Sequence, residues 1–152
     1  MSIFEDFDKK VDLKGLKEDV SEARKNGGSG NYKDVPDGTY EVAITKLEPK
    51  ASRSGDPMLS VWFKILTGDL KGQLIFMNQL LREGFQIGIA EDFLDSLASG
   101  VEISFDSYKQ FENLIMDVKE NIDKDHLEYL LQYSHNDKGF PKYVIKEVYE
   151  EN

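Results

Sequence analysis

The sequence predicts a mainly β fold with helices: a five-stranded, OB-fold-like barrel with a helical insert between strands three and four and an N-terminal helical arm. Three observations support this fold class. From residue 38, apolar and polar residues alternate over three successive stretches, as in half-buried strands. Helical spacing follows over residues 85–98 and 108–118. Alternation then returns over residues 127–149. An antiparallel sheet packed on one side by helices fits the same order of elements.

The first 25 residues are predicted to form an arm. Their apolar residues recur at steps of three and four among mixed charges, which indicates an amphipathic helix: Phe4, Phe7, Val11, Leu13, Leu16, Val20 and Ala23. The run Asn26–Asn31 contains three glycines and no apolar residue, as flexible linkers do. We therefore expect an arm over residues 1–25, a linker over 26–34 and an OB-like domain over 35–152. The arm is expected to pack on the barrel or on a second copy, or to recruit a partner.

The boundaries of the expected strands come from turn residues. The first strand begins at Gly38, and the loop after it is placed at Pro49–Pro57, which holds two prolines and a glycine. Val101–Phe105 is either a short strand or an extended link. The remaining expected elements are strands over 58–66 and 73–80, a hairpin turn over 136–139 and a last strand over 142–149.

Composition limits the possible classes of protein. The chain of 152 residues has no cysteine, so a disulfide scaffold and thiolate chemistry are excluded. Apolar runs are short and the first residues are acidic, so we expect neither a membrane span nor a signal peptide, and a cytoplasmic location. The net charge of −10 argues against coating duplex DNA by bulk charge. Residues 83–128 hold twelve acids against three bases, whereas residues 38–82 hold six bases against four acids, which leaves room for a mildly basic surface.

Catalytic signals are weak. The two histidines, His126 and His135, are interpreted as surface residues, since no metal-binding, nucleophile or phosphate-loop motif accompanies them. Acidic groups such as Glu91-Asp92 with Asp95 have the spacing of a solvated helix face rather than of a calcium loop. We therefore expect no enzyme activity, no cofactor and no metal site.

The second strand carries the clearest binding signal. Leu59, Val61, Phe63 and Ile65 form a wholly apolar face. The pleat of the strand therefore places Trp62 and Lys64 on its other side. A flat ring beside a cation can stack a base and hold its phosphate without reading sequence. The alternative is that the helical insert or the arm covers Trp62.

Two loops and the third strand complete the expected site. OB-folds hold ligands across strands two and three, between the loop joining strands one and two and the loop joining strands four and five. The nucleic-acid-binding residues predicted on this basis are Trp62, Lys64, Lys50, Arg53, Phe76, Lys138, Phe140 and Lys142.

The sequence resembles a family of small phage proteins of unknown function, encoded in replication and recombination modules of phages of Gram-positive bacteria. The resemblance rests on the segments Val35–Val42, Gly55–Leu66, Lys71–Gln79 and Gly84–Ile87, and it continues through Tyr108–Leu114 and the final hairpin. It implies a single-stranded-DNA-binding role, in the cytoplasm of a bacterial host, beside a RecA-like or helicase-loader ATPase. The chain ends in Glu147–Asn152 rather than in the long acidic tail by which many such proteins recruit partners.

The sequence thus predicts a sequence-tolerant binder of single-stranded DNA that acts in phage replication or recombination. An acidic inhibitor is the alternative, because the acidic block over residues 83–128 could imitate the phosphates of nucleic acid in the basic groove of a host protein. A homo-oligomer is left open, as are the nucleotide footprint and any preference for RNA.

Overall fold

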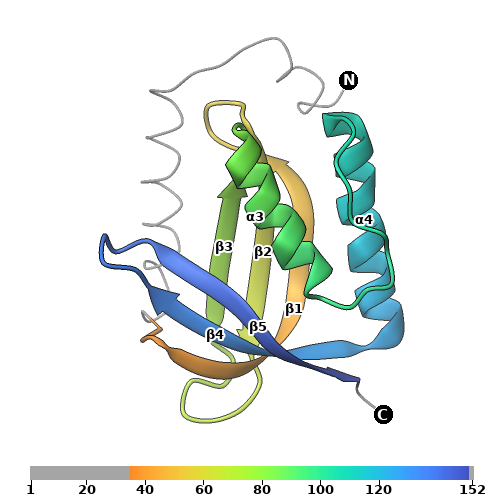
Figure 1. Cartoon of the computed structure of the whole chain (residues 1–152). Helices are drawn as coiled ribbons and strands as arrows, with labels where there is room; N and C mark the ends of the chain where they lie inside the picture. The colour runs from red at the N-terminus through yellow and green to blue at the C-terminus, as the bar shows by residue number, and fades with distance from the viewer. Residues whose placement is uncertain (1–34, 151–152) are drawn as a thin grey trace.

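The computed structural model describes residues 35–150, which form five strands and two helices (Figure 1). In chain order these are β1 (Gly38–Ala51), β2 (Pro57–Ile65), β3 (Leu74–Leu80), α3 (Gly84–Asp95), α4 (Tyr108–Asp125), β4 (Leu127–His135) and β5 (Pro141–Glu150). The predicted arm and linker lie outside the described residues.

The five strands form one antiparallel sheet in the order β3-β2-β1-β4-β5. β1 is the central strand: its start pairs with β4 up to Val42, and the part from Val42 onward pairs with β2. Within residues 35–150, β3 and β5 each pair with a single strand, so the sheet is open. The mainly β class and the helices between β3 and β4 are therefore confirmed, whereas closure into a barrel is not.

Several boundaries differ from the sequence-based expectation, most clearly the ends of β1 and α4. β1 continues through Pro49 and Lys50 to Ala51, where a loop was expected. Proline fits there because β1 pairs with β2 on one side and, beyond Val42, with no described strand on the other. Val101–Phe105 is not a strand but a link between the helices. α4 extends to Asp125 and ends at His126, which adopts the left-handed conformation with φ of 54°.

One face of the sheet packs with both helices to form the core. The predicted apolar face of β2 is confirmed, since Leu59, Val61, Phe63 and Ile65 are fully buried. α3 crosses this face in front of β2 and β3, and α4 lies beside β1 (Figure 1). Two tyrosine hydroxyls bind backbone carbonyls in the core: Tyr108 donates to Leu81 at 2.7 Å and Tyr129 to Leu97 at 2.8 Å.

The gap between β3 and β5 is bridged by a side chain rather than by a strand ladder. The hydroxyl of Tyr143 on β5 donates to the carbonyl of Phe76 on β3 at 2.6 Å. The ring of Tyr143 stacks on Phe63, with centroids 6.0 Å apart, and lies 5.6 Å from the ring of Tyr133. Tyr143 thus ties the two edges of the open sheet together through the core.

Tyr129, which is buried, and Tyr143, which is partly buried, predict a loss of stability in alkali. Burial raises the pKa of both Tyr129 and Tyr143 well above the ordinary value of about 10. The contribution of these two hydroxyls to the free energy of unfolding is fully present below pH 10. It is lost as the pH rises above 10, because the unfolded chain then releases protons that the folded chain retains. Each tyrosine should lower the free energy of unfolding by about 1.4 kcal/mol per pH unit above pH 10. Urea unfolding between pH 9 and 11 measures this slope.

The corresponding control removes the titrating hydroxyls. A Tyr129→Phe and Tyr143→Phe double variant should be less stable at pH 7, because it loses two hydrogen bonds, but its stability should fall less steeply above pH 10. An unchanged slope in that variant would show that other groups cause the alkaline loss.

Neither α3 nor α4 has both the length and the apolar character needed to cross a membrane.

Candidate nucleic-acid interface

Three side chains lie in a row across the outer face of the sheet, on neighbouring strands. In the strand register, Trp62 of β2 lies opposite Lys46 of β1 on one side and Phe76 of β3 on the other. The Trp62 and Phe76 rings meet edge to face, with centroids 5.3 Å apart. The ammonium of Lys46 lies over the Trp62 ring, 4.3 Å from its centroid. We call Lys46, Trp62 and Phe76 the outer row.

A β-bulge brings Lys46 into this row. The register between β1 and β2 shifts between Ile44 and Lys46, so the alternation of buried and outward-facing residues reverses at Thr45. Ile44 and Leu47 are therefore both buried, although they are three residues apart. Strict alternation would have placed Lys46 on the core side, which is why the sequence did not predict it as a site residue.

The outer row is partly open to solvent. Trp62 and Phe76 are half-buried, and Lys64, two residues after Trp62 on the same face of β2, is exposed. The predicted residues Trp62, Lys64 and Phe76 therefore share one surface, with Lys46 added. Such a surface offers ring area for stacking and two ammonium groups that can meet phosphate. The ammonium of Lys46 also lies 3.8 Å from Oε1 of Glu48, so a phosphate would compete with that carboxylate.

A groove runs along the edge of β3, between α3 and the β4–β5 hairpin. It has a volume of about 1340 Å³. Four of the predicted residues line it, namely Phe76, Lys138, Phe140 and Lys142. We call it the β3–β5 groove. Phe76 belongs to both surfaces, so the outer row and the hairpin residues are neighbours across β3.

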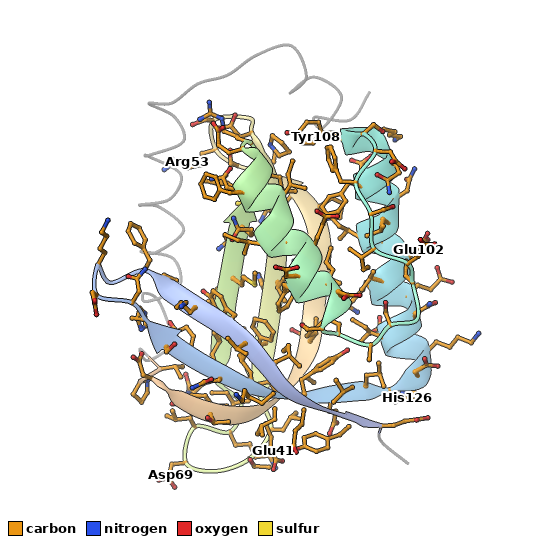
Figure 2. All side chains as sticks on the ribbon, viewed as in Figure 1. Glu41, Arg53, Asp69, Glu102, Tyr108 and His126 are labelled. Atoms are coloured by element: carbon orange, nitrogen blue, oxygen red, sulfur yellow. The ribbon has the colours of Figure 1, made fainter. Side chains whose placement is uncertain are left out.

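The other two predicted residues lie apart from this groove. Lys50 is at the end of β1, and Arg53 is in the loop between β1 and β2. Arg53 projects from the top of that loop in Figure 2, whereas the hairpin lies at the left of the view. Both side chains are exposed, and neither lines the β3–β5 groove. The structure therefore brings six of the eight predicted residues to one region of the molecule.

Residues 18–130 match a protein-family model described as Protein of unknown function (DUF669). The chain belongs to this family. The comparison with curated proteins gave no match. The predicted resemblance to a family of unknown function is thus confirmed, and the family description itself assigns no activity.

The matched part of this DUF669 chain contains the outer row but not the hairpin. The match covers β1, β2, β3, both helices and the start of β4, and it ends at residue 130. Trp62, Phe76, Lys46 and Lys64 therefore lie in the part shared with the family model. Lys138, Phe140 and Lys142 lie beyond it.

The base of the hairpin is held by a histidine and an aspartate. The Nδ1 atom of His135 lies 2.6 Å from Oδ1 of Asp37, and its backbone N–H donates to Oδ2 at 3.2 Å. These hydrogen bonds lower the pKa of Asp37, with the side-chain bond as the largest cause. His135 and His126 are both exposed, as predicted, and Figure 2 shows His126 at the lower end of α4. His135 thus fixes the hairpin to the start of β1.

The loop between β1 and β2 is anchored by a buried ion pair that the sequence did not predict. Nε of Arg82 lies 4.0 Å from Oδ1 of Asp56, and both side chains are almost completely buried. Asp56 also closes the loop, since its backbone N–H donates to the hydroxyl of Ser52 at 2.9 Å. Arg82 precedes α3, so the pair ties the loop to the entrance of that helix.

The acidic residues of the helices do not form a metal site in the part of the chain that the structure covers. Across residues 35–150, no group of three or more histidine, aspartate or glutamate side chains could hold a metal ion. Asp92, Asp95, Asp117, Glu120, Asp123 and Asp125 are exposed on α3 and α4. The acidic block therefore forms solvated helix surfaces.

Proposed function

We propose that this chain binds single-stranded DNA with little regard for base sequence, in phage replication or recombination as the resemblance to phage proteins implies. The observation that carries the proposal is the outer row: Trp62 and Phe76 lie side by side on β2 and β3, with Lys46 over the indole ring. Aromatic platforms flanked by cations are the usual means of binding single strands.

The chemistry of the outer row favours sequence tolerance. Every base has a π face that can stack on an aromatic ring, so stacking does not select a sequence. Lys46 and Lys64 are point charges that suit phosphates. A base that stacks on this face of Trp62 would displace the ammonium of Lys46 from the ring, and the displaced ammonium could then contact a phosphate of the same strand. The lysine thus changes from a cation–π contact to a phosphate contact.

The strand order of the open sheet supports the proposal of an OB-like fold. β1 pairs with both β2 and β4, and the helices lie between β3 and β4, as in a partly open Greek-key barrel. In that fold, ligands cross strands two and three between two loops. Here that path leads from Lys64 and Trp62 over Phe76 to Lys138, Phe140 and Lys142. Lys50 and Arg53 extend it at the other end of β2.

The small number of cations on this path predicts a shallow dependence on salt. Each phosphate neutralised on a single strand contributes about −0.7 to the slope of log K against log salt. Contacts from all six cations of the path, namely Lys46, Lys50, Arg53, Lys64, Lys138 and Lys142, should therefore give a slope of about −4 or shallower. Titration of a fluorescent oligothymidine at several salt concentrations measures it. An affinity independent of salt, or strict preference for one sequence over oligothymidine, would count against the proposal.

The same titration tests the acidic-inhibitor alternative. The observation that favours that alternative is the exposed acidic surface of α3 and α4. If oligothymidine does not bind at low salt, while a basic nucleic-acid enzyme captures the chain, the inhibitor proposal replaces ours.

A matched control is Lys124→Ala on α4, which removes an exposed cation away from the path and should leave oligothymidine affinity unchanged. Lys64→Ala should weaken it and make the salt slope shallower by about 0.7.

A further inference from the structure

The helix α3 is apolar on two faces, and only one of them is covered by the sheet. Ile87, Ala90, Phe93 and Leu94 are buried in the core. Phe85 and Ile89, one turn apart, are 69% and 47% exposed and both line the β3–β5 groove. Exposed large apolar side chains that lie together often mark an interaction surface, so the Phe85 and Ile89 face indicates one.

The opposite wall of the groove is apolar as well. Phe140 and Val144, from the hairpin and β5, are each 44% exposed and face the groove. Four of the exposed large hydrophobic side chains in residues 35–150 thus gather in one place. A groove with apolar residues on both walls fits the apolar face of an amphipathic helix. Aliphatic groups such as Ile89 and Val144 offer nothing to a phosphate and little to a base.

The chain itself supplies a segment with this character, and the described part of the chain begins at the groove. Val35, the first residue of the described part, lines the groove. Residues 3–23 precede it with the apolar stripe that contains Phe4, Phe7 and Val11. As a helix, this stretch would be about 30 Å long. The eleven residues 24–34 between this stretch and Val35 span at most roughly 40 Å, so the arm stays within reach.

We propose that residues 3–23 dock their apolar stripe in the β3–β5 groove of the same chain. The hairpin wall carries Lys138 and Lys142, and the α3 wall carries Asp92. The first twelve residues hold four acids against two bases, so their charge complements the hairpin wall. The short tether gives the arm a high effective concentration at the groove, which favours this occupant over a second copy. Docking would also cover the hairpin end of the proposed DNA path, a consequence that rests on the proposed function.

The absence of cysteine allows a direct test on the full chain. In a Ser2→Cys variant, one nitroxide spin label is attached to the introduced thiol. The label broadens the amide signals of nearby residues, so the spectrum of the ¹⁵N-labelled protein reports which residues it approaches. We expect selective broadening at Phe85, Ile89 and Val144, and its loss when the label is reduced. A label on Lys124→Cys, on α4, should leave these signals sharp.

Two substitutions in the groove sharpen the test. The Phe85→Ser and Ile89→Ser double variant should abolish the broadening elsewhere in the groove, and both positions are exposed, so the fold should survive. Met116→Ser is the matched control, because Met116 is 49% exposed on α4 outside the groove. It should leave the broadening unchanged, and thermal melting checks that both variants remain folded.

Mixing the samples distinguishes one chain from two. In a mixture, one chain carries the spin label without ¹⁵N, and the other carries ¹⁵N without a spin label. No groove signal should be broadened in this mixture if the arm docks on its own domain. Broadening in the mixed sample would overturn the proposal in favour of a second copy as occupant. Absence of any groove broadening in the singly labelled chain, or broadening that persists in the Phe85→Ser and Ile89→Ser variant, would overturn docking in the groove. None of these readouts requires DNA, so they are independent of the proposed function.

Discussion

Replacing Arg82 with methionine should lower the free energy of unfolding by about 3–5 kcal/mol, because it removes the cation beside a buried carboxylate. Asp56 is 0% exposed, and its Oδ1 lies 4.0 Å from Nε of Arg82. An ionised carboxyl group without that charge partner remains desolvated, and water cannot compensate. Urea denaturation of the two proteins at pH 7 measures the difference.

A double variant separates the ion pair from simple packing. Arg82→Met combined with Asp56→Leu removes both charges, so it should be more stable than Arg82→Met alone, since replacement of a buried pair by apolar groups is often close to neutral. Lys71→Met is the control for an exposed cation, because Lys71 lies at the surface in the turn before β3. If Arg82→Met cost no more than Lys71→Met, the pair would not anchor the loop.

Replacing Trp62 with alanine should weaken binding of oligothymidine by about 1–3 kcal/mol, or roughly 5- to 150-fold, because one stacked base is lost. The effect on stability should be smaller than the 3–5 kcal/mol typical of a fully buried aromatic residue, since Trp62 is half-buried on the outer face of the sheet. Fluorescence anisotropy of labelled oligothymidine measures affinity, and thermal melting of the same samples measures stability.

Two further variants show whether binding requires an aromatic ring at position 62 or is lost on removal of any exposed aromatic residue. Trp62→Phe keeps a ring opposite Phe76 and should retain most of the affinity. Tyr149→Ala removes an exposed aromatic residue of β5 and should leave affinity unchanged. Equal losses for Tyr149→Ala and Trp62→Ala, or a Trp62→Ala variant that binds normally, would remove the outer row from the site.

Much of the fold follows from local patterns in the chain. The alternation in β2 predicts its buried face correctly, because each residue there obeys the pleat without interruption. The helical spacing from Tyr108 onward likewise predicts α4, and the Asn136–Gly139 turn predicts the hairpin. These features depend on neighbours in sequence, and a single sequence contains that information.

The unpredicted features depend on distant parts of the chain. The bulge at Thr45 moves Lys46 onto the outer face, and no local signal marks it. Asp56 and Arg82 are 26 positions apart and meet only when the β1–β2 loop packs against the start of α3. The β3–β5 groove likewise needs the hairpin to lie opposite α3. The open sheet results from pairing between strands, which alternation alone does not determine.

The fluorescence of Trp62, the only tryptophan, tests the central proposal most directly. Titration of the full chain with unlabelled oligothymidine at low salt should quench this fluorescence in a saturable manner, and added salt should reverse the quenching. The midpoint should agree with the anisotropy titration. If oligothymidine binds while the Trp62 emission stays unchanged, or if no binding occurs at low salt, the outer row on β2 and β3 is not a site for single-stranded DNA.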